Sequence, residues 1–125
     1  MVCVDRNAER INRALAHRAS YRGRIVGVVA DANEPLPFEV ESFKGAVIVH
    51  PMDLLVLETV APLLCPGGVL VFETYEARGE NWRSLPAHRS VRARLKSRFG
   101  FLDYKERLVG PNKQHAVVKL CAFRL

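Results

Sequence analysis

Side chains that could bind a ligand or move a proton follow three apolar, β-prone runs of this sequence. Asp5 and Asp31 come after the first two runs, and His50 follows the third. A carboxylate accepts hydrogen bonds from two donors at once, and an imidazole exchanges a proton near neutral pH. The ordinary alternatives are a turn or helix-cap aspartate and a plain loop histidine.

A longer polar stretch follows the fourth apolar run. It begins with Glu73, Thr74 and Tyr75, contains glycine and extends to Pro86, and it is the only long irregular segment that the sequence indicates. Long loops in compact domains are usually functional or mobile. We therefore count these three residues as candidate substrate-binding residues on a loop.

The apolar runs themselves have the pattern of strands buried in a parallel sheet, because they are nearly continuous and rich in β-branched residues. Strands are predicted over residues 1–4, 24–30, 43–49 and 69–72, and two more, 101–109 and 115–125, flank a short connector. That connector is short enough for an antiparallel hairpin.

Helices are predicted between these strands, where apolar residues recur at helical spacing. The apolar stripes are Ala8, Ile11 and Leu15; Leu54, Leu57, Val60, Ala61 and Leu64; and Val91, Leu95 and Phe99, with Gly100 ending the last helix. Alternating strands and helices favour an α/β fold with a mostly parallel sheet and helices on both faces, closed by the hairpin.

Composition places the chain among ordinary globular proteins. It has 125 residues, 49% of them hydrophobic, which is about the size of one domain. No apolar run of about eighteen residues is present, and charge comes too early for a secretory signal. We expect a soluble, cytoplasmic protein without a membrane partner. The scattered cysteines and histidines predict no metal site.

Positive charge is concentrated near residue 90. The formal net charge is +6, and Arg89, Arg92 and Lys96 belong to one short basic segment. A solvated helix face is the simpler interpretation. Nucleic-acid binding is the alternative, although no aromatic residues alternate with the basic ones to stack on bases.

Several motifs, in order, resemble those of class I S-adenosylmethionine-dependent methyltransferases. Val4-Asp5 resembles the end of that family's second strand, and Asp31 to Phe38 resembles the acidic residue and "LPF" loop after the third. The segment Ser42 to His50 resembles the fourth strand, and Leu63-Leu64-Cys65-Pro66-Gly67-Gly68-Val69-Leu70-Val71 resembles the "LLkPGGvLv" entry to the fifth. The resemblance spans nearly the whole chain and implies a Rossmann-like fold.

The resemblance also implies residue roles. Asp5 and Arg6 would lie at the cofactor ribose, Asp31 and Ala32 beside the adenine, and His50 at the site of methyl transfer, with S-adenosylmethionine as the cofactor. Glu73, Thr74 and Tyr75 would contact the methyl acceptor. In open α/β sheets such ligands bind at the carboxyl ends of the strands.

One part of the family pattern is absent from these residues. The family's first strand and its glycine-rich turn should precede Asp5 by some twenty residues, where only Met1 to Val4 stand. Gly67-Gly68 enters a strand rather than leaving one, so it cannot replace that turn. The expectation is thus a single, truncated domain over residues 1–125. The strands ending at Asp5 and Val49 either close the gap directly or leave an open edge for a homodimer.

Two principal functions remain open at this point. The chain resembles a methyltransferase of unknown acceptor, in which alignment of acceptor and methyl carbon would be the main requirement. The alternative is a non-catalytic binding or assembly module of the same fold. Polyanion binding through the basic segment is a third and weaker possibility.

Overall fold

The computed structural model describes residues 1–17, 24–51, 53–78, 85–113 and 115–125. Its contacts divide the chain into two compact units, Met1–Pro37 and Phe38–Leu125. The described strands form two sheets, one of two strands and one of four. Of the two alternatives from the sequence, direct pairing of the strands that end at Asp5 and Val49 is not found, because no described strand has ladders to both sheets.

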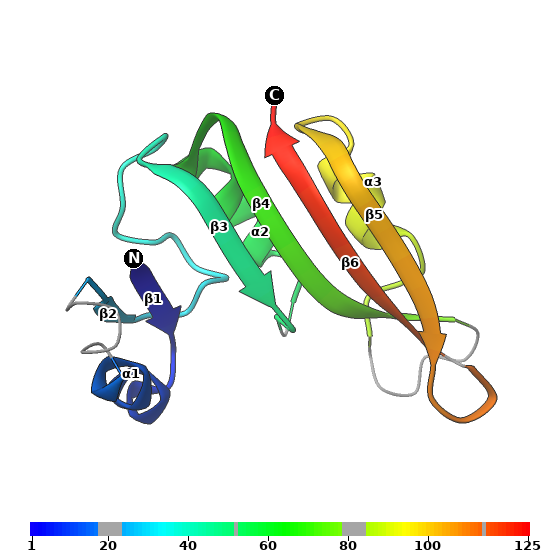
Figure 1. The fold of residues 1–125 in the computed structure, drawn as a ribbon, viewed down its shortest axis with the longest axis horizontal. Coiled ribbons are helices and arrows are strands. Elements are labelled where there is room, and N and C mark those ends of the chain that lie inside the picture. The colour runs from blue at the N-terminus through cyan, green and yellow to red at the C-terminus, as the bar shows by residue number, and fades with distance from the viewer. Residues whose placement is uncertain (18–23, 52, 79–84, 114) are drawn as a thin grey trace. The chain divides into compact units, whose positions relative to one another are not determined.

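The first unit is a parallel strand–helix–strand unit, as the sequence predicts. Strand β1 (Val2–Asp5) pairs in parallel with β2 (Val26–Val29), and α1 (Ala8–Ala16) connects them in the chain (Figure 1). The ladder places Asp5 opposite Val29. Both strands therefore end at the same edge of this small sheet.

Helix α1 is fixed at its start and along one face. The Asn7 side chain accepts hydrogen bonds from the backbone N–H groups of Glu9 and Arg10, which caps the helix. Ile11 is buried, as its place in the apolar stripe predicts. A Cβ atom added to Gly27 would lie 2.5 Å from Ile11, so glycine is what lets the helix approach β2 closely.

The second unit is built on a four-stranded mixed sheet in the order β3-β4-β6-β5. Its strands are β3 (Phe43–Val49), β4 (Leu64–Ala77), β5 (Phe99–Val109) and β6 (His115–Arg124). Strands β3 and β4 are parallel, and β6 runs antiparallel to both of its neighbours. The predicted C-terminal hairpin is thereby confirmed, and β6 alone opposes the common strand direction.

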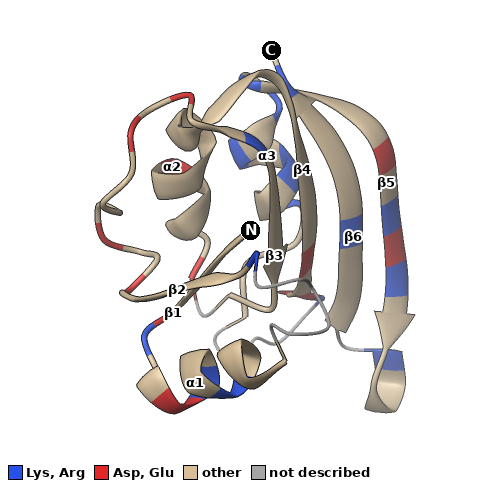
Figure 2. Ribbon diagram, turned by 60° about the vertical axis from the view of Figure 1, so that its left-hand side comes forward, with Lys and Arg blue, Asp and Glu red and all other residues tan. Residues whose placement is uncertain are grey.

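Two short helices cover one face of this sheet, α2 (Val56–Val60) and α3 (Ser90–Leu95) (Figures 1 and 2). Within the described part of this unit no helix covers the other face, so helices on both faces are not found here. The helix predicted from the apolar stripe Leu54 to Leu64 is shorter than expected. It becomes a 3-10 turn at Ala61–Leu63, where Pro62 lacks a backbone donor, and Leu64 already begins β4.

The core lies between these helices and the sheet. Phe72 of β4 and Val118 of β6 are fully buried, as are Val91 and Leu95 of α3. The opposite face of the sheet, which we call the open face, carries exposed valines instead. These are Val47 and Val49 of β3, with 73% and 58% of their surface exposed, and Val69 and Val71 of β4.

Two boundaries differ from the sequence prediction. Glu73, Thr74 and Tyr75 lie inside β4 rather than in a loop, because their backbone pairs with β6 from Val69 to Ala77. Part of the predicted loop, residues 79–84, is outside the described residues. Phe99 is buried as expected, but it begins β5 instead of ending a helix.

Candidate functional site

The carboxyl ends of β3 and β4 bring His50 and Glu73 together. These strands are parallel, and Val49 at the end of β3 lies opposite Glu73. The backbone N–H of His50 donates to the Glu73 carbonyl oxygen at 2.8 Å. The ring atom Nε2 of His50 lies 3.2 Å from Glu73 Oε1. The predicted base and one predicted substrate residue are therefore in direct contact.

Lys119 and Tyr75 complete this group. Lys119 lies opposite Glu73 in the β4–β6 ladder, and its Nζ is 3.0 Å from Glu73 Oε2. The Tyr75 ring stacks on His50 with centroids 4.7 Å apart and planes 13° apart. Tyr75 and Glu73 are two residues apart in a strand, so their side chains share one face of the sheet. We call His50, Glu73, Tyr75 and Lys119 the His50 cluster.

The charge of Glu73 is set by its neighbours. The hydrogen bond from Lys119 lowers the pKa of Glu73 below its ordinary value, and the charges of Lys119 and His50 act in the same direction. Desolvation acts against them and does not prevail. Glu73 is therefore an ionised carboxylate at neutral pH.

Thr74 is not brought into the His50 cluster. Its side chain is 3% exposed and lies on the face that the helices cover, because neighbouring residues of a strand point to opposite faces. Lys119 is a member that the sequence interpretation missed. Its only signal was a lysine between apolar residues of the last strand, and that does not reveal the register with β4.

The cofactor candidates Asp5 and Asp31 lie in the first unit, each in a local turn. Asp5 Oδ1 accepts a hydrogen bond from Asn7 N at 2.8 Å, and Asp31 Oδ1 accepts one from Asn33 N at 2.9 Å. The turn role weighed for both residues is therefore present. Each carboxylate keeps further lone pairs. Arg6 and Ala32 follow the two aspartates directly.

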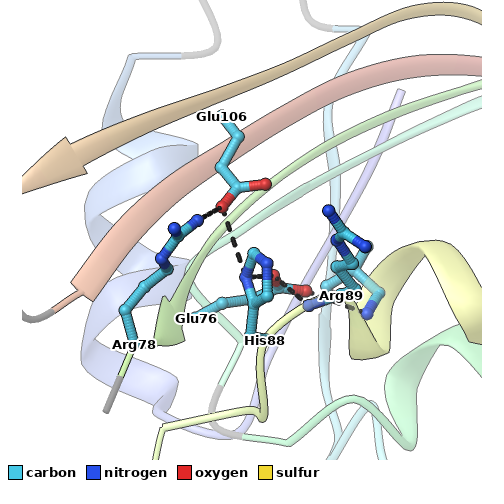
Figure 3. Close-up of polar contacts among 6 residues, drawn as sticks. Glu76, Arg78, His88, Arg89 and Glu106 are labelled. Atoms are coloured by element: carbon cyan, nitrogen blue, oxygen red, sulfur yellow. Dashed lines mark hydrogen bonds and ion pairs between the residues drawn. The ribbon is translucent and has the colours of Figure 1, made fainter.

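A second polar cluster joins β4, β5 and the start of α3 (Figure 3). The Glu76 side chain is fully buried, and its two oxygens accept hydrogen bonds from Arg89 N at 2.7 Å and Val91 N at 3.0 Å. Glu76 thus caps α3 from a neighbouring strand. Its role is structural.

Glu106 and His88 extend this cluster. Glu106 Oε1 forms an ion pair with Arg78 at 2.7 Å and lies 3.3 Å from His88 Nδ1, without the alignment of a hydrogen bond. Nearby, burial raises the pKa of Tyr104 to about 12, with the charges of Glu76 and Glu106 acting in the same direction. The Tyr104 hydroxyl is therefore protonated at every working pH.

The basic segment begins at the N-terminal cap of α3 and lies partly on that helix (Figure 2). Arg89, Arg92 and Lys96 are exposed, as the sequence predicts. The Arg92 guanidinium lies over the rings of Phe101 and Tyr104, at 5.6 and 5.4 Å from their centroids. This contact engages one of the three cations considered for nucleic-acid binding.

We predict that the protein does not bind RNA or DNA, even at low salt, because several cations of the described basic segment are already engaged. Arg92 lies over two aromatic rings, and Arg94 and Arg98 form ion pairs with Glu58. Fluorescence anisotropy with labelled single- and double-stranded oligonucleotides measures this. Binding that falls steeply with salt, by about 0.9 log units per log of salt for each phosphate neutralised on duplex DNA, would contradict the prediction. The triple glutamine variant of Arg89, Arg92 and Lys96 should then lose that binding while keeping its stability.

No protein-family model and no curated protein matches the sequence. Solved structures do match. Geranyl diphosphate methyltransferase in complex with SAM has a TM-score of 0.83 at 12% identity, over 99% of this chain and 68% of that one. Geranyl diphosphate C-methyltransferase from Streptomyces coelicolor A3(2), in complex with S-adenosyl-L-homocysteine, has a TM-score of 0.82 at 12% identity, over 99% and 63%. The chain has a methyltransferase-like fold.

The same fold also serves a different reaction among the matches. The [4+2]-cyclase SpnF has a TM-score of 0.78 at 12% identity, over 98% of this chain and 66% of that one. The chain thus spans about two thirds of the length of these three proteins, 63–68%. Because one fold supports more than one chemistry, function has to be argued from the site.

No three or more His, Cys, Asp or Glu side chains of the described residues come together in a group that could hold a metal ion. Among the described helices, none has the length and apolar character needed to cross a membrane.

Proposed function

We propose that this chain is part of an S-adenosylmethionine-dependent methyltransferase in which His50 is the general base. The observation that supports it best is the contact between His50 and Glu73 at the carboxyl ends of parallel strands, where open α/β sheets bind ligands. When bound, S-adenosylmethionine supplies a methyl group made electrophilic by its sulfonium sulfur. The chain's own residues hold the cofactor, orient the acceptor and accept its proton.

The cofactor would be held in part by Asp5 and Asp31. Their strands are paired in parallel, so both side chains follow the same edge of the two-stranded sheet. Each uses Oδ1 in its own turn. The other oxygen of Asp5 lies 3.7 Å from an Arg10 guanidinium nitrogen, in an exposed ion pair that a ligand would have to share. A carboxylate suits ribose hydroxyls and an adenine amino group because it only accepts hydrogen bonds. Arg6 and Ala32 would flank these contacts. The 125 residues contain no glycine-rich turn for the methionine part.

The acceptor would meet His50 and Tyr75 on the open face. His50 has 40% of its side chain exposed, and Tyr75 is also exposed. A proton acceptor that solvent can reach next to an aromatic face is a suitable position for a nucleophile that must lose a proton. Glu73, another member of the His50 cluster, contacts Nε2 of this histidine.

We expect this chain to bind S-adenosylmethionine more weakly than the low micromolar range, because the contacts of a glycine-rich turn are absent. Asp5→Ala should weaken binding further by about 1.5–3 kcal/mol, the contribution of a hydrogen bond to a charged group. Calorimetric titration gives the affinity, and amide NMR shifts at millimolar cofactor identify the residues that respond. A low micromolar dissociation constant would contradict the expected weakness.

Asp53→Ala is the matched control for Asp5→Ala. Asp53 Oδ1 accepts a hydrogen bond from Leu55 N at 2.8 Å, which is the same turn that Asp5 makes with Asn7. Losing a turn of this kind should leave cofactor binding unchanged. If millimolar cofactor moves no amide signal near Asp5 or Asp31, the proposed cofactor site is wrong.

A non-catalytic assembly module is the second candidate, and the edge of β3 favours it. Among the described strands, β3 is hydrogen-bonded to β4 alone, and it carries the exposed residues Val47 and Val49 and no proline. Edge strands are usually protected by charge, proline or short length, because a bare edge pairs with other chains. The one charged residue of β3 is Lys44, near its start, and residues 45–49 carry no charged side chain. A second copy of this strand is the occupant that we propose.

We predict a homodimer in which two β3 strands pair antiparallel across a two-fold axis. Light scattering should give twice the monomer mass for the parent protein. The Val47→Lys variant should give the monomer mass. Val71→Lys is the control. Val71 lies opposite Val47 on the same face, but its strand β4 is hydrogen-bonded to β3 on one side and to β6 on the other. A monomer at high concentration contradicts the dimer, and equal loss in both variants indicates packing of open faces instead of edges.

A further inference from the structure

The Glu73 carboxylate lies between a cation and an imidazole, and each of its oxygens faces one of them. Oε2 is 3.0 Å from Lys119 Nζ, and Oε1 is 3.2 Å from His50 Nε2. These contacts link three strands, because Lys119 belongs to β6, Glu73 to β4 and His50 follows β3. These two contacts hold the Glu73 carboxylate in place and favour its ionised form.

An ionised carboxylate has no proton to donate, so it can only accept a hydrogen bond. The imidazole nitrogen that faces it must then carry the proton whenever the ring is neutral. In His50 that nitrogen is Nε2. The other nitrogen, Nδ1, consequently holds the free lone pair, and the hydrogen bond made by one ring nitrogen determines the chemistry of the other.

Two further contacts hold the ring in place. Tyr75 stacks on the imidazole nearly parallel to it, which limits rotation of the ring plane. The backbone at His50 has a positive φ of 48°, a conformation that non-glycine residues seldom adopt. The hydrogen bond from His50 N to the Glu73 carbonyl holds that turn. Backbone and side chain of His50 are therefore both tied to the same residue.

We propose that Glu73 and Lys119 are positioning residues for His50. They fix its neutral form with the proton on Nε2 and leave Nδ1 to take the proton of the methyl acceptor. This inference rests on the proposed methyltransferase function and makes its substrate class more specific. It also moves Glu73 from contacting the acceptor to orienting the base.

The proton balance defines the acceptor. Its reacting atom gives a proton to Nδ1, keeps the electron pair of the broken bond and uses that pair to form a bond to the methyl carbon. The bond between that carbon and the sulfonium sulfur of S-adenosylmethionine would break at the same time, with its electron pair going to sulfur. The acceptor class is therefore a hydroxyl, a protonated amine or an acidic carbon. A thioether or an unprotonated tertiary amine has no such proton and would not need this base.

Nitrogen NMR of the full 125-residue chain tests the assignment without any acceptor or cofactor. At about pH 9 histidine side chains are neutral, and the shifts of the two ring nitrogens report which one carries the proton. We expect Nε2–H in about tenfold excess or more at His50, because its partner accepts only. Lys119→Met and Glu73→Gln should each lower that ratio at least about twofold, since a carboxylate without its cation, or an amide, orients the ring less strictly.

Two lysine variants separate positioning from a general surface effect. Lys119→Arg keeps the cation and should keep the ratio. Lys105→Met removes the neighbour that lies opposite Lys119 on β5, and this lysine pairs with Asp103 at 3.1 Å instead of Glu73. That variant should leave His50 unchanged. Lys119 has 61% of its side chain exposed, so Lys119→Met should fold normally.

Carboxyl NMR of Glu73 supplies the second measurement. Lys119→Met should raise the pKa of Glu73, because the hydrogen bond from Lys119 is the largest cause of its lowering. A majority of Nδ1–H in the parent protein would overturn the inference, and so would a His50 ratio that is the same in Lys119→Met. If the protein fails to bind the cofactor, the proposed function is wrong but this inference about His50 is not, because the NMR samples contain no cofactor.

Discussion

Replacement of Leu95 by alanine should lower the free energy of unfolding by about 2–5 kcal/mol, the usual cost of a large-to-small change in a packed core. Leu95 is completely buried in α3 and faces the sheet together with Val91. A helix of six residues has little stability of its own, so its packing supplies most of what holds it. Urea denaturation of both proteins measures the difference.

Ala93→Ser is the control for this change. Ala93 lies in the same helix but is exposed, so its replacement should change the stability by less than about 0.5 kcal/mol. A near-neutral result for Leu95→Ala would show that α3 is rotated. The exposure of Arg92 and Lys96 would then have to be reassigned with it.

Glu76→Ala should destabilise the protein by about 3 kcal/mol or more. The change leaves the backbone N–H groups of Arg89 and Val91 without their acceptor, and hydrogen bonds to a charged group contribute about 1.5–3 kcal/mol each. The site is buried, so water cannot replace the carboxylate easily. Chemical denaturation gives the magnitude, and protection of the Val91 amide from hydrogen exchange should fall in parallel.

Two conservative variants sharpen this test. Glu76→Gln keeps the shape and one acceptor oxygen, so it should cost less than the alanine change. Glu106→Gln removes the neighbouring carboxylate, whose ion pair with Arg78 is partly exposed and should contribute only about 0–1 kcal/mol. Equal losses in Glu76→Ala and Glu106→Gln would show that the cap on α3 is not the source of the stability.

The elements whose signal is local could be predicted from sequence. The β-branched runs that became β2 and β3, and the helical stripe through Ile11, have a period that one short window contains. The same holds for the final hairpin, whose two strands are adjacent in the chain. Asp5, Asp31 and His50 are candidates for the same reason, since each follows such a run.

Contacts between distant strands could not be predicted in this way. Lys119 meets Glu73 only through the register of β4 with β6, and no local feature of either strand defines that register. The polar neighbours of Thr74 predict a loop. In the structure its backbone pairs with β6, and its side chain is buried in the core.

Gly100 shows how a sound local rule led to a wrong boundary. Glycine after an apolar stripe is typical of a helix end, so the sequence predicts Phe99 as the last helical contact. In the structure Gly100 lies inside β5, and a Cβ atom there would come within 2.3 Å of the Phe123 ring. The glycine makes room for an aromatic ring on the next strand.

The turns at Asp5 and Asp31 have a consequence for any ligand that these residues bind. A free aspartate loses rotational freedom when it closes on a ligand, and that loss weakens the complex. Here one oxygen of each carboxylate is already bound to a backbone N–H two residues ahead. The side chains are thus ordered before a ligand arrives, so the entropic cost of fixing them falls on folding rather than on binding.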